Sequence, residues 1–518
     1  MKKTFLSLVA LVILTATAAS GCGGGSSGGS DLAGLASPGS LVFAEGTVQS
    51  EGELKSDVDA LANKIAGVDS LGGLIVSKLE EEAREKEEPL DFAKEVEPWL
   101  GERGAISFSK LDGDGDLSGY GILLETTDPE ATQATIDHQA KVNPDPVKEG
   151  TYRGVAYWTD TGDETVVGLI GDTFVGAEDA RSFRAAVDAE QGESLGDESQ
   201  FQDAISAASD GSLADVYVDI GGLIEASGDS IDPTAREILQ NAGIDPSEAT
   251  AVASLIPGSD QIEIDLSSDL GGEEAPSGDA SDLLASMPAD SFAALATTGF
   301  GDQLKEALDN LDASGVPGEL PPNQLKSGLA QVGIDLDEVA SSLEDAAVFA
   351  RGTNESNLGG ALVLTTSSDE TVQSIGRLGK ILRSAGFPGV TALTGKASGF
   401  SVRSEELGHY PLVVAAEGKR IAVGYGLRQT LAGLETSAEA TLGDSVAYKD
   451  AVTALGSTPI GAFVAGPAAL GLAESLVSRS ETGFWEAVPY LKKIDYVAIG
   501  SDADGETATA KAIVGVEG

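Results

Sequence analysis

Residues 195–205 read Leu-Gly-Asp-Glu-Ser-Gln-Phe-Gln-Asp-Ala-Ile, and residues 442–452 read Leu-Gly-Asp-Ser-Val-Ala-Tyr-Lys-Asp-Ala-Val. Both stretches begin with Leu-Gly-Asp, carry an aromatic residue in the middle and end with Asp-Ala and a β-branched residue. Equivalent points lie about 240 to 250 residues apart, which is too long for a solenoid repeat and suits the duplication of a whole domain.

Weaker sequence similarities between the two halves occur in the same order along the chain. The segment that starts at Pro288 resembles the segment that starts at Pro38. Leu-Leu-Glu-Thr-Thr at residues 123–127 returns as Leu-Val-Leu-Thr-Thr at residues 362–366. Chance could produce one such similarity, but the shared order favours an internal duplication.

The two halves are separated by a stretch with linker composition. Residues 271–278 contain no large aliphatic or aromatic side chain and are rich in Gly, Glu, Ser and Pro. We therefore predict two tandem similar domains, at residues 35–270 and 281–518, joined by a linker at residues 271–280. Short apolar runs separated by turn residues, mixed with helical spacing, predict the α+β class, each domain being a mainly antiparallel sheet packed with helices.

Local signals place several elements. Asp128 followed by Pro129 is a strong helix start, an N-cap with proline at the first helical position. Apolar residues at 105–108 and 120–124 predict a hairpin across an acidic turn. A final hairpin, with strands at 496–499 and 507–514, is expected to close the second sheet.

The start of the chain has the three-part layout of a secretory signal. Lys2 and Lys3 precede a largely apolar run that is too short to cross a bilayer, and the run ends in Ala19-Ser20-Gly21-Cys22. These four residues resemble the lipobox of bacterial lipoproteins. The resemblance implies cleavage before Cys22 and a diacylglyceryl thioether on its sulfur.

We therefore expect a signal peptide at residues 1–21, and a lipidated cysteine with a Gly/Ser tether at residues 22–34. The expected location is extracytoplasmic, on the bacterial cell membrane, with the lipid at Cys22 as the membrane contact. The alternative is an ordinary signal peptide with an accidental cysteine. Against it, Cys22 is the only cysteine in the sequence, which also excludes a disulfide framework and cysteine-ligated zinc.

The charge is strongly acidic. The chain has 84 acidic residues against 32 Lys and Arg, a formal charge of −52, and such a field repels nucleic acid. It favours a cationic or protein partner in the envelope, but a solvated acidic surface that maintains solubility is the simpler explanation of the charge.

Two motifs carry a family resemblance: the Pro-x-Asp or Pro-x-Ser strand openings at Pro38 and Pro288, and the Leu-Gly-Asp…Asp-Ala helices at residues 195–205 and 442–452. With them the chain resembles bacterial exported proteins of the domain of unknown function 3352 family, over most of residues 35–518. The resemblance implies an envelope protein with no assigned activity, and no catalytic residues come with it.

Asp112, Asp114 and Asp116 start like a calcium-binding EF-hand loop. The loop then departs from the pattern, with Leu117 in place of the glycine and Leu123 in place of the glutamate. We treat the three aspartates as weak metal candidates, the alternative being a plain polar turn.

The sequence indicates no enzyme and no cofactor. Its two histidines, His138 and His409, are expected to be exposed polar residues. Paired carboxylates could serve an extracytoplasmic hydrolase, but aromatic residues, which carbohydrate sites use for stacking, make up only 5% of the chain. The leading prediction is a non-catalytic binding or structural protein. The alternatives are that hydrolase and a solute-binding receptor with a ligand cleft.

Overall fold

The computed structural model describes residues 31–85, 91–113, 115–142, 146–162, 164–228, 249–269, 278–305, 327, 329–331, 333–404, 410–435, 440–505 and 507–517. The chain divides into two compact units. The first unit comprises Met1–Pro276, Ala503–Lys511 and Val516–Gly518, and the second comprises Ser277–Asp502 and Ala512–Gly515. Within the part of the chain that is described, no helix is long and apolar enough to cross a bilayer.

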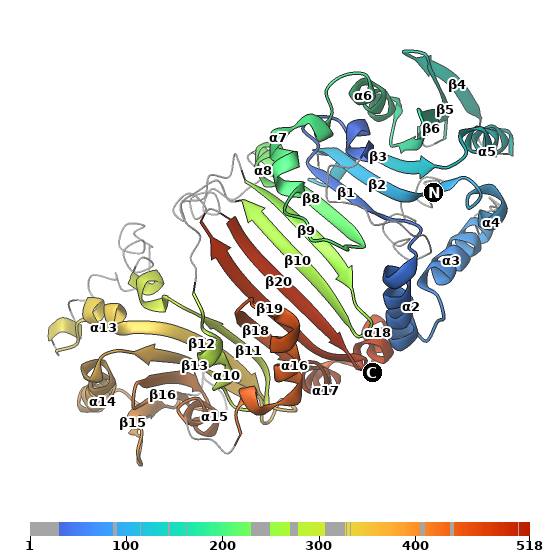
Figure 1. The fold of residues 1–518 in the computed structure, drawn as a ribbon. Coiled ribbons are helices and arrows are strands. Elements are labelled where there is room, and N and C mark those ends of the chain that lie inside the picture. The colour runs from blue at the N-terminus through green and yellow to red at the C-terminus, as the bar shows by residue number, and fades with distance from the viewer. Residues whose placement is uncertain are drawn as a thin grey trace. The chain divides into compact units, whose positions relative to one another are not determined.

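The first unit is built on an antiparallel sheet (Figure 1). Its central strand β1 pairs on one side with β2 and on the other with β8. Beyond β2 follow β3, β7, β6, β5 and β4, and beyond β8 follow β9 and β10. The strands are β1 (Val42–Thr47), β2 (Leu100–Leu111), β3 (Leu117–Thr126), β4 (Val147–Tyr152), β5 (Val155–Asp160), β6 (Val166–Ile170), β7 (Thr173–Ala177), β8 (Ala214–Asp219), β9 (Thr250–Pro257) and β10 (Gln261–Asp269).

The second unit repeats this connectivity. Its central strand β11 pairs with β12 and β18; beyond β12 follow β13, β17, β16, β15 and β14, and beyond β18 follow β19 and β20. The strands are β11 (Ser291–Thr297), β12 (Leu343–Arg351), β13 (Gly359–Thr366), β14 (Val390–Ala392), β15 (Ser398–Val402), β16 (Leu412–Glu417), β17 (Arg420–Tyr425), β18 (Ile460–Ala465), β19 (Ile494–Asp504) and β20 (Thr507–Val516). The α+β class is confirmed, and the duplication stays a prediction that superposing the two units would test.

Helices occupy corresponding places in the strand order. The first unit has η1 (Asp31–Leu35), α2 (Gly52–Ala66), α3 (Leu71–Glu85), α4 (Phe92–Glu95), α5 (Pro129–Val142), α6 (Ala180–Glu190), η2 (Leu195–Asp197), α7 (Ser199–Ile205) and α8 (Ile220–Ser227). The second has α10 (Ser281–Ala285), α13 (Leu336–Ser342), α14 (Asp369–Ser384), α15 (Leu427–Ala432), η5 (Leu442–Asp444), α16 (Val446–Leu455), α17 (Gly466–Leu476) and α18 (Thr482–Leu491).

The Leu-Gly-Asp motif forms the same capped turn in both units. In the first, the Asp197 carboxylate accepts hydrogen bonds from the Ser194 hydroxyl (2.8 Å) and backbone N–H (3.0 Å). In the second, Asp444 accepts the equivalent bonds from the Thr441 hydroxyl (3.0 Å) and N–H (2.9 Å). These bonds to Ser194 and Thr441 lower the pKa of both carboxyls.

The aromatic residue of the motif lies in the helix after Leu-Gly-Asp and packs that helix against the sheet. Phe201 is 1% exposed and meets the rings of Phe43 and Tyr217 edge-on, at centroid distances of 5.6 and 5.0 Å. In the second unit Tyr448 contacts Phe463 in the same way, at 5.3 Å. Both residues therefore act as core anchors.

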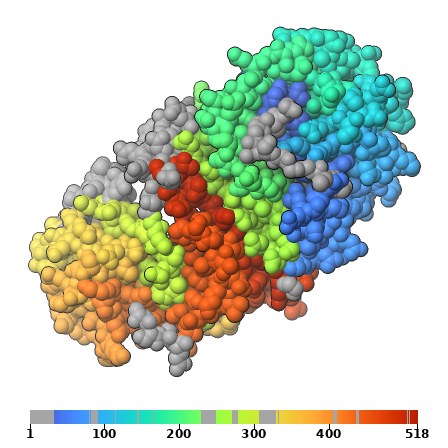
Figure 2. All heavy atoms as spheres, in the orientation of Figure 1, coloured from blue at the N-terminus to red at the C-terminus, as the bar shows by residue number. Residues whose placement is uncertain are grey.

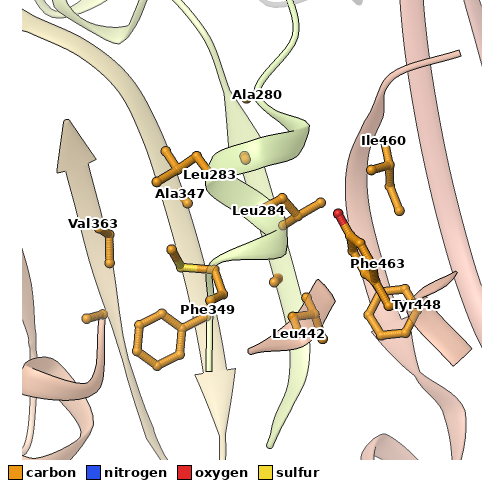
Figure 3. Packing of buried hydrophobic residues seen from close by; sticks show 14 of the residues in the cluster. Ala280, Leu283, Leu284, Ala347, Phe349, Val363, Leu442, Tyr448, Ile460 and Phe463 are labelled. Atoms are coloured by element: carbon orange, nitrogen blue, oxygen red, sulfur yellow. The ribbon is translucent and has the colours of Figure 1, made fainter. Parts of the chain in front are cut away.

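Each unit buries apolar side chains on both faces of its sheet. In the first, Phe43 and Phe201 belong to one cluster, and Trp99 and Ile136 to another on the opposite face. Figure 3 shows part of the largest cluster of the second unit, in which Leu284 of α10, Tyr448 of α16 and Phe463 of β18 pack together.

The C-terminal hairpin differs from the prediction. Strand β20 pairs with β19 as expected, but it also pairs with β10, and its residues Thr507–Lys511 belong to the first unit. Lys511 forms ion pairs with Glu263 and, at 3.5 Å, with Asp265, both on β10. Part of the last strand of the domain predicted for residues 281–518 thus belongs to the first unit, where it pairs with β10.

Candidate functional site

Helix α5 forms one wall of the candidate site. Asp128 starts the helix by accepting a hydrogen bond from the Ala131 N–H at 3.0 Å. Buried Thr132 fixes the first turn through a 2.6 Å hydrogen bond with Thr126, and Ile136, 4% exposed, inserts into the core. With these residues fixed, the neighbouring face of the helix presents Gln133 and Asp137 to a cavity that residues of β5 and β6 also line.

The opposite wall is made by strands β4, β5 and β6. In their antiparallel register Trp158 of β5 lies between Glu149 of β4 and Val167 of β6. Adjacent cross-strand residues share a face of the sheet, so Glu149, Trp158 and Val167 point to the same side. That side faces α5, which contacts β6.

The β4–β5 hairpin is held at its tip by α6. The turn residue Arg153 has a positive φ of 47° and forms a 3.0 Å ion pair with Asp188 of α6. The Tyr152 hydroxyl donates to the same carboxylate at 3.1 Å. Arg184 of α6 donates to the Tyr157 hydroxyl at 2.9 Å, and this bond raises the pKa of Arg184.

Two cavities lie between these walls, with volumes of about 260 and 250 Å³. Both are lined by Asp137, Glu149 and Trp158, and we call this region the α5–β5 groove. Ile136 and Val167 add apolar surface to the first cavity, and Ala140 and Lys141 line the second. Helix α5 and strands β4–β6 lie at the surface of the first unit (Figure 2).

In the described structure, the acidic side chains of the groove receive few hydrogen bonds from the protein. Glu149 is exposed, and Asp137 accepts one hydrogen bond, from the Gln133 side chain at 2.9 Å. The indole N–H of Trp158 is buried and has no hydrogen-bond acceptor among the described residues. An unpaired buried donor of this kind costs about 1–3 kcal/mol.

The corresponding place in the second unit is closed. Helix α14 crosses β15 at Gly379, where an added Cβ would lie 2.9 Å from the Phe400 side chain. Phe400 is 4% exposed under this close helix–strand contact. In the first unit the larger Trp158 is only partly buried and borders two cavities.

The predicted acidic turn joins β2 and β3 as expected. The Asp116 N–H donates to the Asp112 carboxylate at 3.0 Å, and the Asp112 N–H donates to the Asp116 carbonyl at 2.8 Å. Asp114 lies outside the described residues. Over the described ranges, no three His, Cys, Asp or Glu side chains are grouped so that they could hold a metal ion.

The remaining predicted residues lie apart from the groove or outside the description. His138 is exposed on α5 and does not line either cavity. His409 and Cys22 fall outside the described residues, as do the signal peptide and residues 271–277 of the linker, so lipid anchoring stays a prediction.

Sequence reasoning missed the groove. It did not single out Trp158 and did not predict β4, the strand that brings Glu149 beside it. The only signal for β4 was that Val147, Glu149 and Thr151 alternate with their neighbours, as on one side of a strand. This signal is weak because charged residues and a glycine interrupt the pattern.

Comparison with known proteins gives a family and two distant structures. The solved structure titled crystal form I of TP0453 matches with 12% identity and a TM-score of 0.25, covering 48% of this chain and 81% of that chain. Crystal form III of TP0453 matches with 9% identity and a TM-score of 0.19, covering 78% and 97%. No curated protein matches.

A family model, by contrast, matches residues 76–398, which is more than half of the sequence. The matched region includes α5, the whole β4–β5 hairpin and the start of the second unit up to the first residue of β15. The chain belongs to the family described as "Protein of unknown function (DUF3352)".

Proposed function

We propose that the chain is an exported, lipid-anchored protein of the bacterial envelope, with a binding role and no catalytic one. The observation that carries the proposal is Ala19-Ser20-Gly21-Cys22 at the end of a short apolar run. Each buried methylene of an acyl chain contributes about 0.8 kcal/mol, and two chains suffice for stable anchoring. Cys22 is thus the proposed membrane contact, in an extracytoplasmic location.

The α5–β5 groove supports the binding role. It is lined by side chains on a helix and on paired strands, which hold their positions more precisely than loops do. Among the described residues, the carboxyls whose pKa is raised, chiefly by burial, are Asp57 and Asp345, and neither lines the groove. We therefore place binding ahead of hydrolysis by paired carboxylates. A formal charge of −52 favours a cationic partner and disfavours nucleic acid.

The test of anchoring compares Cys22→Ala with a matched tether variant, Ser27→Ala, in the full chain expressed in a bacterium. Metabolic labelling with an alkyne fatty acid should label the parent and Ser27→Ala but not Cys22→Ala. Detergent-phase partitioning should follow the label. Equal labelling and equal partitioning of all three proteins would show that Cys22 is not the anchor.

A further inference from the structure

We propose that a basic face of the second unit docks on a bilayer surface that carries anionic phospholipid headgroups. The basic face consists of Lys380 and Arg383 on α14, Phe387 just after that helix, and Lys396 and Arg403 on either side of β15. The inference rests on the membrane location proposed above and adds a second contact to the lipid anchor.

The first basis is the distribution of charge along the chain. Residues 371–404 contain five Lys and Arg and no Asp or Glu, whereas the whole chain has 84 acids in 518 residues. The acid-free stretch ends at Glu405, which lies outside the described residues. In the first unit, α5, β4 and β5 span residues 129–160 and contain five acids. The excess of positive charge is therefore local to the second unit.

The second basis is that the bases of this face are accessible. Lys380, Arg383, Lys396 and Arg403 are exposed, and none of them forms an ion pair within the described part of the chain. Lys380 and Arg383 are three residues apart and therefore lie on neighbouring parts of the helix surface. Grouped exposed bases of this kind attract the anionic headgroups of a bilayer.

The third basis is Phe387, which is 59% exposed. Its backbone is fixed by the end of α14: Gly386 has a φ of 78°, and the Phe387 N–H donates to the Leu382 carbonyl at 3.1 Å. The residue after such a glycine usually packs back on the helix, but Phe387 remains in solvent. An exposed aromatic ring next to bases suits the boundary between headgroups and acyl chains, where both find favourable contacts.

The fold brings the helix and the hairpin together. Gly379 of α14 lies so close to β15 that an added Cβ would be 2.9 Å from the Phe400 side chain, and α14 runs beside this strand (Figure 1). The Arg403 N–H donates to the Gly389 carbonyl at 3.1 Å. Gly389 is two residues after Phe387, so Arg403 and Phe387 lie at the same end of the hairpin. The basic face is therefore formed by packed elements.

The acidity of the whole chain does not cancel this face. The two acids at the start of α14 are paired with other bases, Glu370 with Arg377 at 3.3 Å and Asp369 with Lys419 at 2.9 Å. More distant acids are screened, because the Debye length is about 8 Å at physiological salt, whereas a helix of 16 residues is about 24 Å long. At the bilayer surface the local charge therefore decides the interaction.

The experiment places the full chain, expressed in a bacterium, on vesicles of phosphatidylcholine with or without phosphatidylglycerol. The probe is Phe387→Trp in a Trp485→Phe background, and brominated acyl chains in the vesicles quench an indole that reaches them. Quenching beyond that of the Trp485→Phe background is expected only with phosphatidylglycerol. It should vanish when salt rises from about 0.1 to 1 M, which shortens the screening length from about 10 to 3 Å.

Variants separate the basic face from general charge. Lys380→Gln and Arg383→Gln should each lower the ratio of docked to undocked protein about fivefold, the factor that one base contributes near an anionic surface. Lys396→Gln, on the hairpin, gives a second reading if a change in α14 perturbs folding. The matched control is Lys493→Gln, at an exposed position of the same unit, which removes the same charge and should leave the ratio unchanged.

Three results would overturn the proposal: equal quenching without phosphatidylglycerol, quenching that persists in high salt, or equal effects of Lys380→Gln and Lys493→Gln. A fourth is that soluble polyglutamate, at equal ionic strength, shifts the emission of the Phe387→Trp variant as fully as anionic vesicles do, because the partner would then be an acidic protein. Flotation with pure phosphatidylcholine vesicles reports the anchor at Cys22 alone. Loss of that flotation and loss of phosphatidylglycerol-dependent quenching therefore distinguish failure of the anchor from failure of the basic face.

Discussion

Replacing Lys511 with methionine tests whether the C-terminal strand stabilises the first unit. The Lys511 side chain is 25% exposed, and its partners Glu263 and Asp265 are 16% and 25% exposed. Methionine keeps most of the apolar stem but leaves two neighbouring, partly buried carboxylates without their cation. The Lys511→Met variant should therefore destabilise the first unit specifically.

The magnitude lies between two known limits. Breaking a fully buried ion pair costs about 3–5 kcal/mol, and losing an exposed one costs about 0.2–1 kcal/mol. For partners that are roughly three-quarters buried or more, we expect about 2 kcal/mol. In a unit of this size that corresponds to a Tm lowered by about 4–8 °C.

The pH dependence gives an independent check. Burial disfavours the charged amine of Lys511, but the hydrogen bond to Glu263 and the charge of Asp265 outweigh it, and the pKa is raised. The stabilisation is therefore fully present below the pKa of an unfolded lysine, about 10.4. It is lost as the pH rises through the folded-state pKa, so parent and variant should converge in that range.

The assay is thermal unfolding followed by tryptophan fluorescence in a Trp485→Phe background, in which Trp99 and Trp158 report only on the first unit. The matched control is Lys78→Met, also in the first unit. It removes an exposed 2.8 Å pair with Glu81 and should leave the Tm nearly unchanged. If Lys511→Met lowers the Tm no further than Lys78→Met, the assignment of β20 to the first unit is wrong.

Three further results are expected. Phe201→Ala should lower the free energy of unfolding by about 3–5 kcal/mol, measured by chemical denaturation, because it leaves a cavity between Phe43 and Tyr217. Asp203→Ala, at an exposed position of the same helix, should leave the free energy of unfolding nearly unchanged. Equal effects of the two substitutions would contradict the role of Phe201 as a core anchor. Raising the salt concentration from about 0.01 to 0.1 M shortens the screening length from about 30 to 10 Å. The Tm of a chain with a formal charge of −52 should therefore rise, because its acidic groups repel one another less. A Tm that does not depend on salt would refute self-repulsion as a limit on stability. Micromolar calcium at constant ionic strength should leave the Tm unchanged, as for a plain turn at Asp112, whereas calcium-selective stabilisation would establish a metal site there.

The elements that the sequence predicted have strong local chemistry. Asp128 and Pro129 define the start of α5, and the capped Leu-Gly-Asp turns recur because Asp197 and Asp444 make identical local bonds. Strand β4 was missed because its sequence, Val-Lys-Glu-Gly-Thr-Tyr, is largely polar and half of its residues are exposed. Its pairing depends on β5, which is a tertiary rather than a local signal.

The candidate site was unpredictable for the same reason. Asp137 and Glu149 are ordinary surface acids when read along the chain, and only the packing of α5 against the sheet brings them to one cavity. The contribution of β20 to the first unit was also hidden, because Lys511 and Glu263 are 248 residues apart in the sequence.

The place of β20 has a consequence for the order in which the protein can fold. Synthesis delivers the chain from its N-terminus, so β10 emerges long before the strand that pairs with it. Until β20 arrives, the edge of the first sheet offers unpaired N–H and C=O groups to any extended segment nearby. Closing a loop of that length is also slow. The first unit therefore completes its sheet only after the second has been delivered, and nascent chains halted before Thr507 should be those most prone to aggregation and proteolysis.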